Sequence, residues 1–278
     1  CQGFSKAGKK MSNDPRNSLF REFTRTTKLI KPKYIIGENV EGLLSRKTED
    51  GGTFIDVIKE EFEKLGYTIY YKVFNTVRFN IPQLRKRLII VGIRNDLGKS
   101  FSFPEYLNDG KTNLPDLKEI IKFSMEGAIK LETSDFDMSS IPEECIITDM
   151  ENDENEIIEN VHPYLKLKAK SKNMSYGEKT FDNLLSFGKR ISPIHSEIID
   201  IRNPCKTIIC SYDHQPRLYV PLKNKNGYFI RCLLPDELKQ IQGFPSDFEV
   251  CGNLKNKTVQ IGNAVPPPLV ELIVKQLI

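Results

Sequence analysis

The chain has 278 residues, of which 39% are hydrophobic and 28% charged, and its formal net charge is +4. It is long enough to bury a large core in one big or two modest domains, and no run of about 18 apolar residues indicates a membrane span. The small positive charge permits a polyanionic partner without identifying one. The six cysteines include no C-x-x-C pair and do not combine with the three histidines at zinc-finger spacing. We therefore expect neither a disulfide scaffold nor a metal site, and a reducing compartment is favoured.

The first third of the chain alternates helix and strand patterns. Apolar residues between charges predict a helix over residues 16–31, closed by Pro32, and an amphipathic helix over residues 53–65. Apolar runs predict strands at three places: residues 34–40, 67–74 and 87–93. Because helix and strand alternate, we expect an α/β fold with a parallel sheet.

From about Phe101 the periodicity decays. An acidic stretch over residues 143–159 precedes a basic one that ends at Gly188-Lys189-Arg190. This composition indicates a separate, irregular module, or alternatively solvated loops with ordinary charge runs. Order returns at residues 204–209, and helices are predicted over residues 235–243, with Pro at the first turn, and near residues 268–278.

Three groups of residues have the chemistry of a catalytic site. Cys1 is a thiol in a segment without an apolar pattern, although a lone cysteine more often packs than reacts. Glu38 ends an apolar strand, where partial burial would favour its protonated form, although most such residues are solvated. Gln83, Arg85 and Arg87 alternate, so in an extended chain they share one face; taken alone they also fit an exposed polar strand edge.

Six segments follow one another along the chain: Cys1-Gln2-Gly3-Phe4-Ser5, Asp14-Pro15-Arg16-Asn17-Ser18-Leu19-Phe20, Glu38-Asn39-Val40, Gln83-x-Arg85-x-Arg87, Gln242-Gly243-Phe244-Pro245 and Gln260-Ile261-Gly262-Asn263-Ala264-Val265-Pro266-Pro267. In this order they resemble the DNA (cytosine-5) methyltransferase family. The resemblance covers the chain except residues 101–203. It implies an α/β, Rossmann-like, S-adenosylmethionine-dependent methyltransferase fold, here partial with its N-terminal strands missing, and a smaller, irregular, β-rich target-recognition lobe.

The resemblance also implies a division of the chain. Residues 1–98 would form the catalytic half of the large domain and residues 99–203 the target-recognition region. Residues 204–250 would form the core of the small lobe. Residues 251–278 would return to the large domain, the last of them as a helix.

The family's reaction requires covalent catalysis, because C5 of cytosine is too electron-poor to attack a methyl sulfonium until a thiolate adds at C6. By resemblance, Cys1 is the nucleophile, Glu38 donates a proton to N3, and Arg87 holds the base at O2. Arg85 would help to position the cysteine loop and the DNA backbone. The target nucleotide must leave the duplex stack to be reached.

Further expectations concern ligands. The resemblance implies S-adenosylmethionine as the cofactor, which Asn263, Ala264 and Val265 would contact. Because the glycine turn and acidic residue that grip this donor in the family are not found before Cys1, we expect a missing N-terminal segment or complementary subunit, without which the chain would be inactive. Double-stranded DNA is the expected partner and the complete enzyme is expected to be monomeric. The residues expected to bind DNA are Gln2, Ser5, Gln83, Lys189 and Arg190.

Two alternatives remain at this stage. One is a tRNA cytosine-5 methyltransferase, although Gly3-Phe4-Ser5 and the length of the recognition region favour DNA. The other is a catalytically silent DNA-binding relative, which should have lost Cys1, Glu38 or Arg87. The sequence identifies neither the recognition site in DNA nor the base that removes the C5 proton, and it leaves a cytoplasmic or a nuclear location open.

Overall fold

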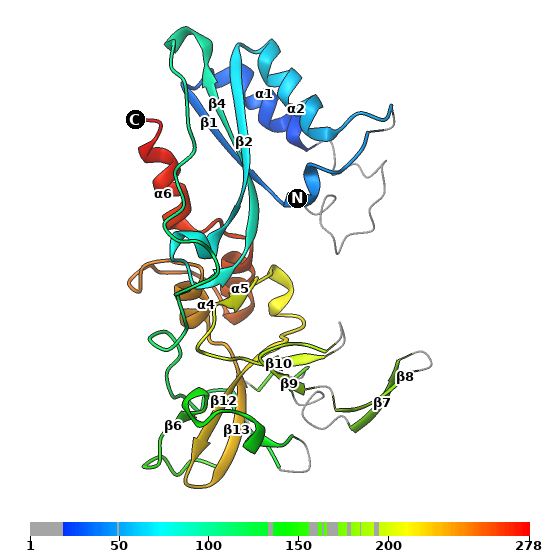
Figure 1. Cartoon of the computed structure of the whole chain (residues 1–278), viewed down its shortest axis with the longest axis vertical. Coiled ribbons are helices and arrows are strands. Elements are labelled where there is room, and N and C mark those ends of the chain that lie inside the picture. Colours follow the sequence, from blue (N-terminus) through cyan, green and yellow to red (C-terminus); the bar gives the residue numbers. More distant parts are fainter. Residues whose placement is uncertain are drawn as a thin grey trace. The chain divides into compact units, whose positions relative to one another are not determined.

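The computed structural model of the chain contains two compact units (Figure 1). Unit 1 comprises the described residues within 1–80, 84–112 and 268–278, and unit 2 those within 81–83 and 113–267. The structure describes residues 19–48, 50–132, 136–155, 161–162, 164–165, 172–176, 179–183, 185–191 and 195–278, with residues 172–176 and 179–183 described by their backbone alone.

Unit 1 is a three-stranded sheet covered by helices. Its elements are α1 (Phe20–Ile30), β1 (Tyr34–Asn39), α2 (Phe54–Lys64), β2 (Tyr67–Asn75), β4 (Lys86–Arg94) and α6 (Pro267–Lys275), of which Pro267 belongs to unit 2. The strand order is β1-β4-β2. Figure 1 shows α1 and α2 on one side of this sheet and α6 on the other.

The sheet is antiparallel at both pairings, so the expected parallel sheet is wrong for unit 1. β4 lies between β1 and β2 and runs opposite to each of them. Only residues 76–85 join β2 to β4, and they begin with a 3-10 turn, Thr76–Phe79. A parallel return needs a crossover of about a dozen residues or more, usually a helix, so the short connection forces an antiparallel neighbour.

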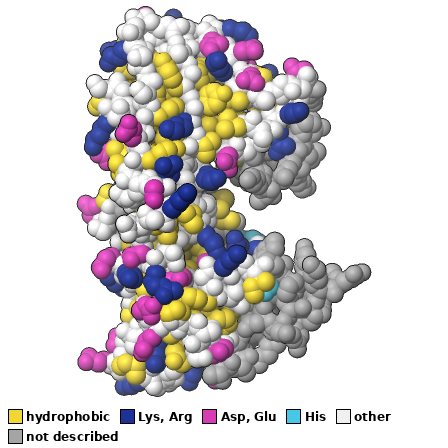
Figure 2. Space-filling view, viewed as in Figure 1, with side chains coloured by type: hydrophobic (Ala, Val, Ile, Leu, Met, Phe, Trp, Pro, Cys, Tyr) yellow, Lys and Arg dark blue, Asp and Glu magenta, His cyan; other side chains and the backbone are white. Residues whose placement is uncertain are grey.

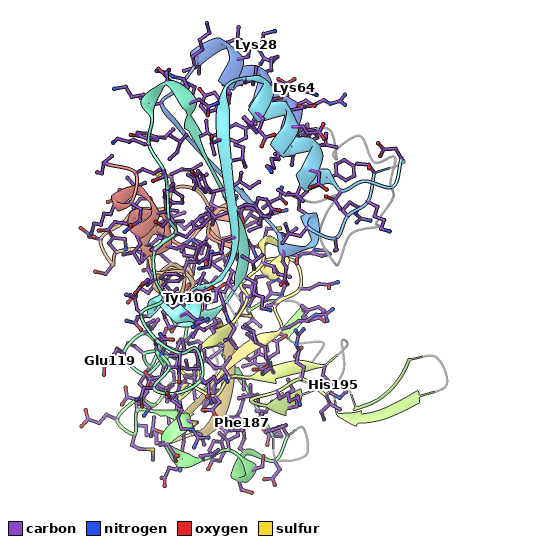
Figure 3. All side chains as sticks on the ribbon, turned by 45° about the horizontal axis from the view of Figure 1, so that its top comes forward. Lys28, Lys64, Tyr106, Glu119, Phe187 and His195 are labelled. Carbon is purple, nitrogen blue, oxygen red and sulfur yellow. The ribbon has the colours of Figure 1, made fainter. Side chains whose placement is uncertain are left out.

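Helix α2 shows how local sequence sets these elements. The Thr53 side chain caps the helix by accepting from the Asp56 amide at 3.3 Å, and Gly66 ends the turn that follows it with a φ of +82°. Phe62, 1% exposed, packs toward the sheet, and burial of such a side chain stabilises by about 2–3 kcal/mol. Lys28 and Lys64 occupy the last turns of α1 and α2, where cations suit the helix dipole, and Figure 3 shows both at the same end of unit 1.

Unit 2 is built around a β-sheet of short strands. Its sheet order is β5-β13-β12-β10-β9, with β6 paired to β12, and β7 and β8 form a separate two-stranded ribbon. The bounds are β5 (Ile129–Lys130), β6 (Ile147–Thr148), β7 (Lys172–Tyr176), β8 (Lys179–Asn183), β9 (Leu185–Phe187), β10 (Ser196–Ile198), β11 (Cys205–Lys206), β12 (Leu218–Asn224), β13 (Gly227–Cys232), α4 (Pro235–Ile241) and α5 (Leu254–Asn263). β3 (Gln83–Leu84) lies where the chain passes from unit 2 back to unit 1.

A buried ion pair fixes α4 against the β12–β13 hairpin. The Arg231 guanidinium is 0% exposed and donates to both carboxylate oxygens of Glu237, at 2.6 and 2.8 Å. Its remaining donors reach the carbonyls of Ser124, Lys122 and Cys232 at 2.8–3.0 Å. Because every donor group of Arg231 is engaged, the buried charge is fully compensated. None of the helices that the structure describes is long and apolar enough to cross a bilayer.

Candidate active site

Glu38 and Arg87 come from neighbouring strands of unit 1. Glu38 of β1 pairs in register with Ile89 of β4, so Arg87, two residues earlier, is its diagonal neighbour on the same face of the sheet. Gly37 and Ile90 form the next register pair and, by the alternation of a strand, face the other way, toward α2. The sheet thus brings together the acid and one of the arginines that the sequence predicted as catalytic.

The two side chains form a close, largely shielded ion pair. Arg87 Nε lies 2.6 Å from Glu38 Oε1, and the side chains are 14% and 21% exposed. Phe74 of β2, which is 0% exposed, is the register partner of Arg87 on its other side. Burial lowers the pKa of the Arg87 guanidinium, and the charge of Glu38 opposes that shift. A carboxyl group and a cation therefore stand side by side with little water between them, which suits stabilisation of charge that develops on a ring.

Arg85 lies between β3 and β4 and is held by its backbone. Its amide donates to Thr76 Oγ1 at 3.3 Å and its carbonyl accepts from the Thr76 amide at 2.9 Å. The side chain is only 1% exposed. Leu84 is 41% exposed and Lys86 is exposed, so burial alternates along this segment as an extended chain requires.

Gln83 does not fit the expectation that it binds DNA. Its side chain is 0% exposed and lies within unit 2. Its Nε2 donates to Gln242 Oε1 at 2.7 Å, and its Oε1 accepts from the Ile208 amide at 3.1 Å. A buried amide engaged at both ends is not available to a base edge or a phosphate.

Asn263, Ala264 and Val265 lie at the end of α5. Asn263 is exposed and is the last helical residue, and Ala264 turns into an extended conformation with φ −65° and ψ 150°. Gly262 permits a close approach, because a Cβ there would lie 2.5 Å from the Cys210 amide nitrogen. The exposed amide of Asn263 on this fixed backbone offers both a donor and an acceptor, which fits the polar groups of S-adenosylmethionine.

The remaining predicted site residues are distributed as follows. Lys189 and Arg190 follow β9 in a turn where the Gly188 amide donates to Ile198 O at 2.9 Å; Lys189 is exposed and Arg190 is half-buried. Cys1, Gln2 and Ser5 lie outside the described residues, so their roles stay predictions. Basic and acidic side chains are both present over each unit on the face that Figure 2 shows, so charge alone does not mark a DNA-binding face.

Three of the cysteines that the structure describes are poor nucleophiles: Cys145 and Cys205 are buried, and Cys232 is half-buried. Burial raises the thiol pKa of Cys145 to about 11 and those of Cys205 and Cys232 to about 12. Attack requires a thiolate, so at neutral pH these three thiols are protonated and unreactive. They are therefore not rivals to Cys1 for the catalytic role.

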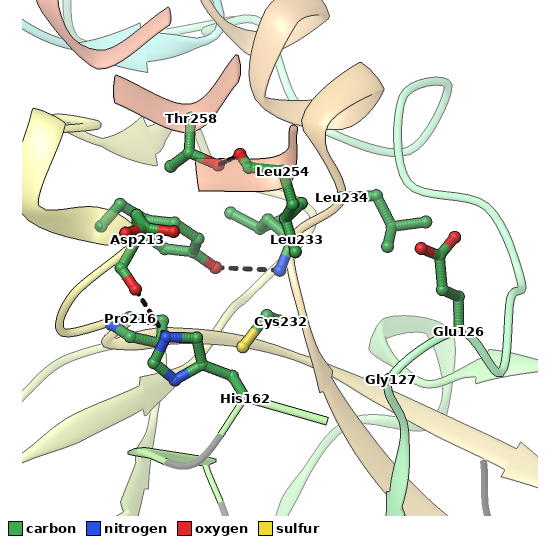
Figure 4. Close-up of a pocket in the computed structure, with 11 residues that line it drawn as sticks. Glu126, Gly127, His162, Asp213, Pro216, Cys232, Leu233, Leu234, Leu254 and Thr258 are labelled. Carbon is green, nitrogen blue, oxygen red and sulfur yellow. Dashed lines mark hydrogen bonds between the residues drawn. The ribbon is translucent and has the colours of Figure 1, made fainter. Parts of the chain in front are cut away.

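A separate hollow of about 50 Å³ in unit 2 contains none of the predicted site residues that the structure describes (Figure 4). Its lining is mainly apolar. Several of its polar groups are engaged: the Leu233 amide donates to the Tyr212 hydroxyl at 2.8 Å, and His162 Nε2 lies 2.5 Å from the Asp213 carbonyl oxygen. We assign it no part in the candidate active site.

Comparison with known proteins decides the family. A family model described as C-5 cytosine-specific DNA methylase matches residues 1–278. The chain belongs to this family. Among its relatives, the Type II methyltransferase M1.HphI of Haemophilus parahaemolyticus is 30% identical over 289 residues, and the match covers 100% of this chain and 66% of the relative. The Type II methyltransferase M.FnuDI of Fusobacterium nucleatum is 30% identical over 285 residues, with 100% and 74% covered.

Solved structures show the same methylase fold. The methyltransferase EhMeth of Entamoeba histolytica matches with a TM-score of 0.56 at 15% identity, over 100% of this chain and 75% of that one. A DNMT2 of Spodoptera frugiperda matches with a TM-score of 0.57 at 16% identity, over 100% and 76%. The predicted Rossmann-like methyltransferase fold is confirmed. The chain spans about two thirds to three quarters of the length of the relatives and structures named here.

Proposed function

We propose that the protein containing this chain is a DNA (cytosine-5) methyltransferase of the type II modification class. Its family model and the printed names of its relatives support the reaction class. The single structural observation that supports it best is the shielded Glu38–Arg87 pair, 2.6 Å apart where β1 ends and β4 begins. Such a pair places a carboxyl group and a cation side by side, as N3 and O2 lie on the same edge of a flipped cytosine; Glu38 would serve as the acid once it has taken up a proton.

Each residue then has a defined task. The Cys1 thiolate adds to C6 of cytosine, and the electron pair of the C5–C6 double bond moves onto the ring. Glu38 donates a proton to N3 while Arg87 holds the carbonyl oxygen O2, so that C5 becomes the nucleophile. After C5 has gained the methyl group, a base removes its proton and the Cys1 thiolate leaves.

S-adenosylmethionine, when bound, supplies the methyl group as an electrophilic sulfonium. We propose that Asn263 and the peptide between Ala264 and Val265 hold part of this donor. Support comes from the exposed amide of Asn263 and from the rigid turn in which α5 ends. These residues orient the donor and take no part in proton transfer.

We further propose that residues 99–203 select the DNA sequence. Lys189 and Arg190 lie in this region, and exposed lysines of such a turn supply mainly phosphate contacts. Within this division, residues 1–98 and 251–278 serve catalysis and donor binding, and residues 204–250 form the core of the small lobe. Exchange of residues 99–203 for those of a relative with a known site should transfer that site. An active chimera with unchanged specificity would refute the assignment.

Bisulfite sequencing tests the reaction itself. DNA from a host that expresses the whole protein should contain cytosines protected from conversion in one sequence context. Glu38→Gln should slow methylation by about 10²–10⁴-fold, the usual contribution of general acid catalysis. If bisulfite converted the cytosines in every sequence context of DNA from cells with abundant parent protein, DNA methylation would be rejected. Methylation of total tRNA in the same cells would instead support the tRNA alternative.

A further inference from the structure

A buried pair of glutamine side chains links three segments of unit 2. Gln83 and Gln242 are both 0% exposed, and they are joined by the 2.7 Å bond from Gln83 Nε2 to Gln242 Oε1. Gln242 Nε2 donates to Ile261 O at 2.7 Å and to Ala264 O at 3.2 Å. The two carbonyls that it holds lie on either side of Asn263 in the chain.

The surrounding groups fix which way each amide points. The Ile208 amide can only donate, so the Gln83 atom that it contacts is the oxygen, and the Gln83 nitrogen is turned toward Gln242. Ile261 O and Ala264 O can only accept, so Gln242 presents its nitrogen to them and its oxygen to Gln83. The order of donors is thus the same along the whole series from Ile208 to Ala264, and no alternative arrangement satisfies all the bonds.

The backbone of Gln242 is equally constrained. It follows α4 directly, where its amide donates to Leu238 O at 3.1 Å, and Gly243 turns the chain away with a φ of +83°. α4 is itself anchored by the buried Arg231–Glu237 pair. Because the backbone of Gln242 is held by these contacts, its two side-chain bonds restrict the movement of the C-terminal turn of α5.

We propose that Gln242, oriented by Gln83, is a positioning residue for the methyl donor. It fixes the carbonyls of Ile261 and Ala264 and so aims the Asn263 amide and the peptide that follows Ala264. This inference rests on the proposed function, because it takes these residues as donor-binding. It also assigns Gln83 to the support of the donor segment in place of DNA contact.

Methionine substitutions test the pair, because methionine keeps the length of glutamine and removes its amide. In the protein that contains this chain, Gln242→Met should weaken binding of S-adenosylhomocysteine, measured by calorimetry, by about 10-fold, the loss expected from one or two hydrogen bonds. Gln83→Met should weaken it by a few-fold, and the double variant should be no worse than Gln242→Met within about twofold. DNA affinity should stay within about twofold, since neither side chain is exposed.

Gln240→Met is the matched control, because Gln240 lies on α4, is half-buried, and its side chain donates to Asp236 O of its own helix, at 3.3 Å. It should bind donor and DNA like the parent.

Hydrogen exchange provides a readout independent of binding: amides of residues 262–265 should exchange faster in Gln242→Met and Gln83→Met but not in Gln240→Met. If Gln242→Met does not fold, Gln83→Met decides, since it keeps the Gln242 amide and removes only the bond that orients it. Equal losses of donor and DNA affinity, or unchanged donor affinity and exchange, would overturn the proposal. A folded parent that binds no donor would instead reject the proposed function, and the exchange data would still decide whether Gln242 holds Asn263.

Discussion

Substitution of Gly262 by alanine should displace the end of α5. A Cβ at this position would lie 2.5 Å from Cys210 N, 2.6 Å from Ile209 C and 2.8 Å from Cys210 Cα, whereas ordinary contacts begin at 3.4 Å. All three neighbours are backbone atoms, so no side chain can rotate away. The helix must move by nearly the difference, 3.4 − 2.5 = 0.9 Å. Overpacking of this kind costs about 1–3 kcal/mol of folding free energy.

The same shift should affect function more strongly than stability. Asn263 follows Gly262 directly, and a misplacement of about 1 Å at a positioning residue costs on the order of 100-fold in rate. Urea unfolding and methyl transfer from tritiated S-adenosylmethionine measure the two effects. Gly52→Ala is the control, because its added Cβ would meet only side-chain oxygens, Thr48 Oγ1 at 3.3 Å and Asp50 Oδ1 at 3.8 Å, and these can rotate away. It should change neither quantity. Parent-like stability and rate in Gly262→Ala would refute the close packing of α5 at this point.

Three further predictions concern unit 2. Glu237→Gln leaves the buried charge of Arg231 without its counterion, so urea unfolding should show that the free energy of unfolding falls by about 3 kcal/mol. A fall of less than about 1 kcal/mol would contradict the ion pair. The pKa of Asp200 is lowered to about 2, chiefly by Arg202, so its stabilisation is present above the unfolded value near 4 and is lost as pH falls toward 2. Asp200→Asn should therefore lower the free energy of unfolding by about 1 kcal/mol at pH 7, after allowance for the solvent around Arg202. This difference in stability from the parent should shrink below about pH 4. A difference that did not change with pH would exclude the Asp200–Arg202 ion pair as its origin. Iodoacetamide at pH 7.5, followed by mass spectrometry, should label the exposed Cys251 within minutes and leave the two buried thiols, Cys145 and Cys205, unlabelled until the protein unfolds.

The elements of unit 1 could be predicted because each has a strong local signal. The apolar face of α2 and the apolar runs of β1, β2 and β4 gave their positions to within a few residues. Strand direction could not be read in the same way, because it depends on whether residues 76–85 can hold a crossover helix. The diagonal contact between Glu38 and Arg87 depends on the register in which β1 pairs with β4, and the sequence of either strand alone does not specify that register.

Unit 2 carried weaker signals. α5 was not predicted, because in Leu254–Asn263 only Thr258, Ile261 and Gly262 are buried and the segment lacks a clear apolar face. Gln242 lay in a segment that resembled the family, yet nothing in the sequence indicated that its amide joins Gln83 to the end of α5. A buried polar pair of this kind is visible only when residues 159 positions apart are brought together.

The most direct test of the central claim is covalent trapping at Cys1. The protein that contains this chain is incubated with S-adenosylmethionine and a duplex with 5-fluorocytosine at the target position, whose fluorine cannot leave as a proton, so the thiol remains bound to C6. The parent and Cys251→Ser, which removes an exposed thiol, should both form a complex that survives denaturation, and Cys1→Ser should form none. An equal yield of that complex from Cys1→Ser would show that Cys1 is not the nucleophile and would contradict the account.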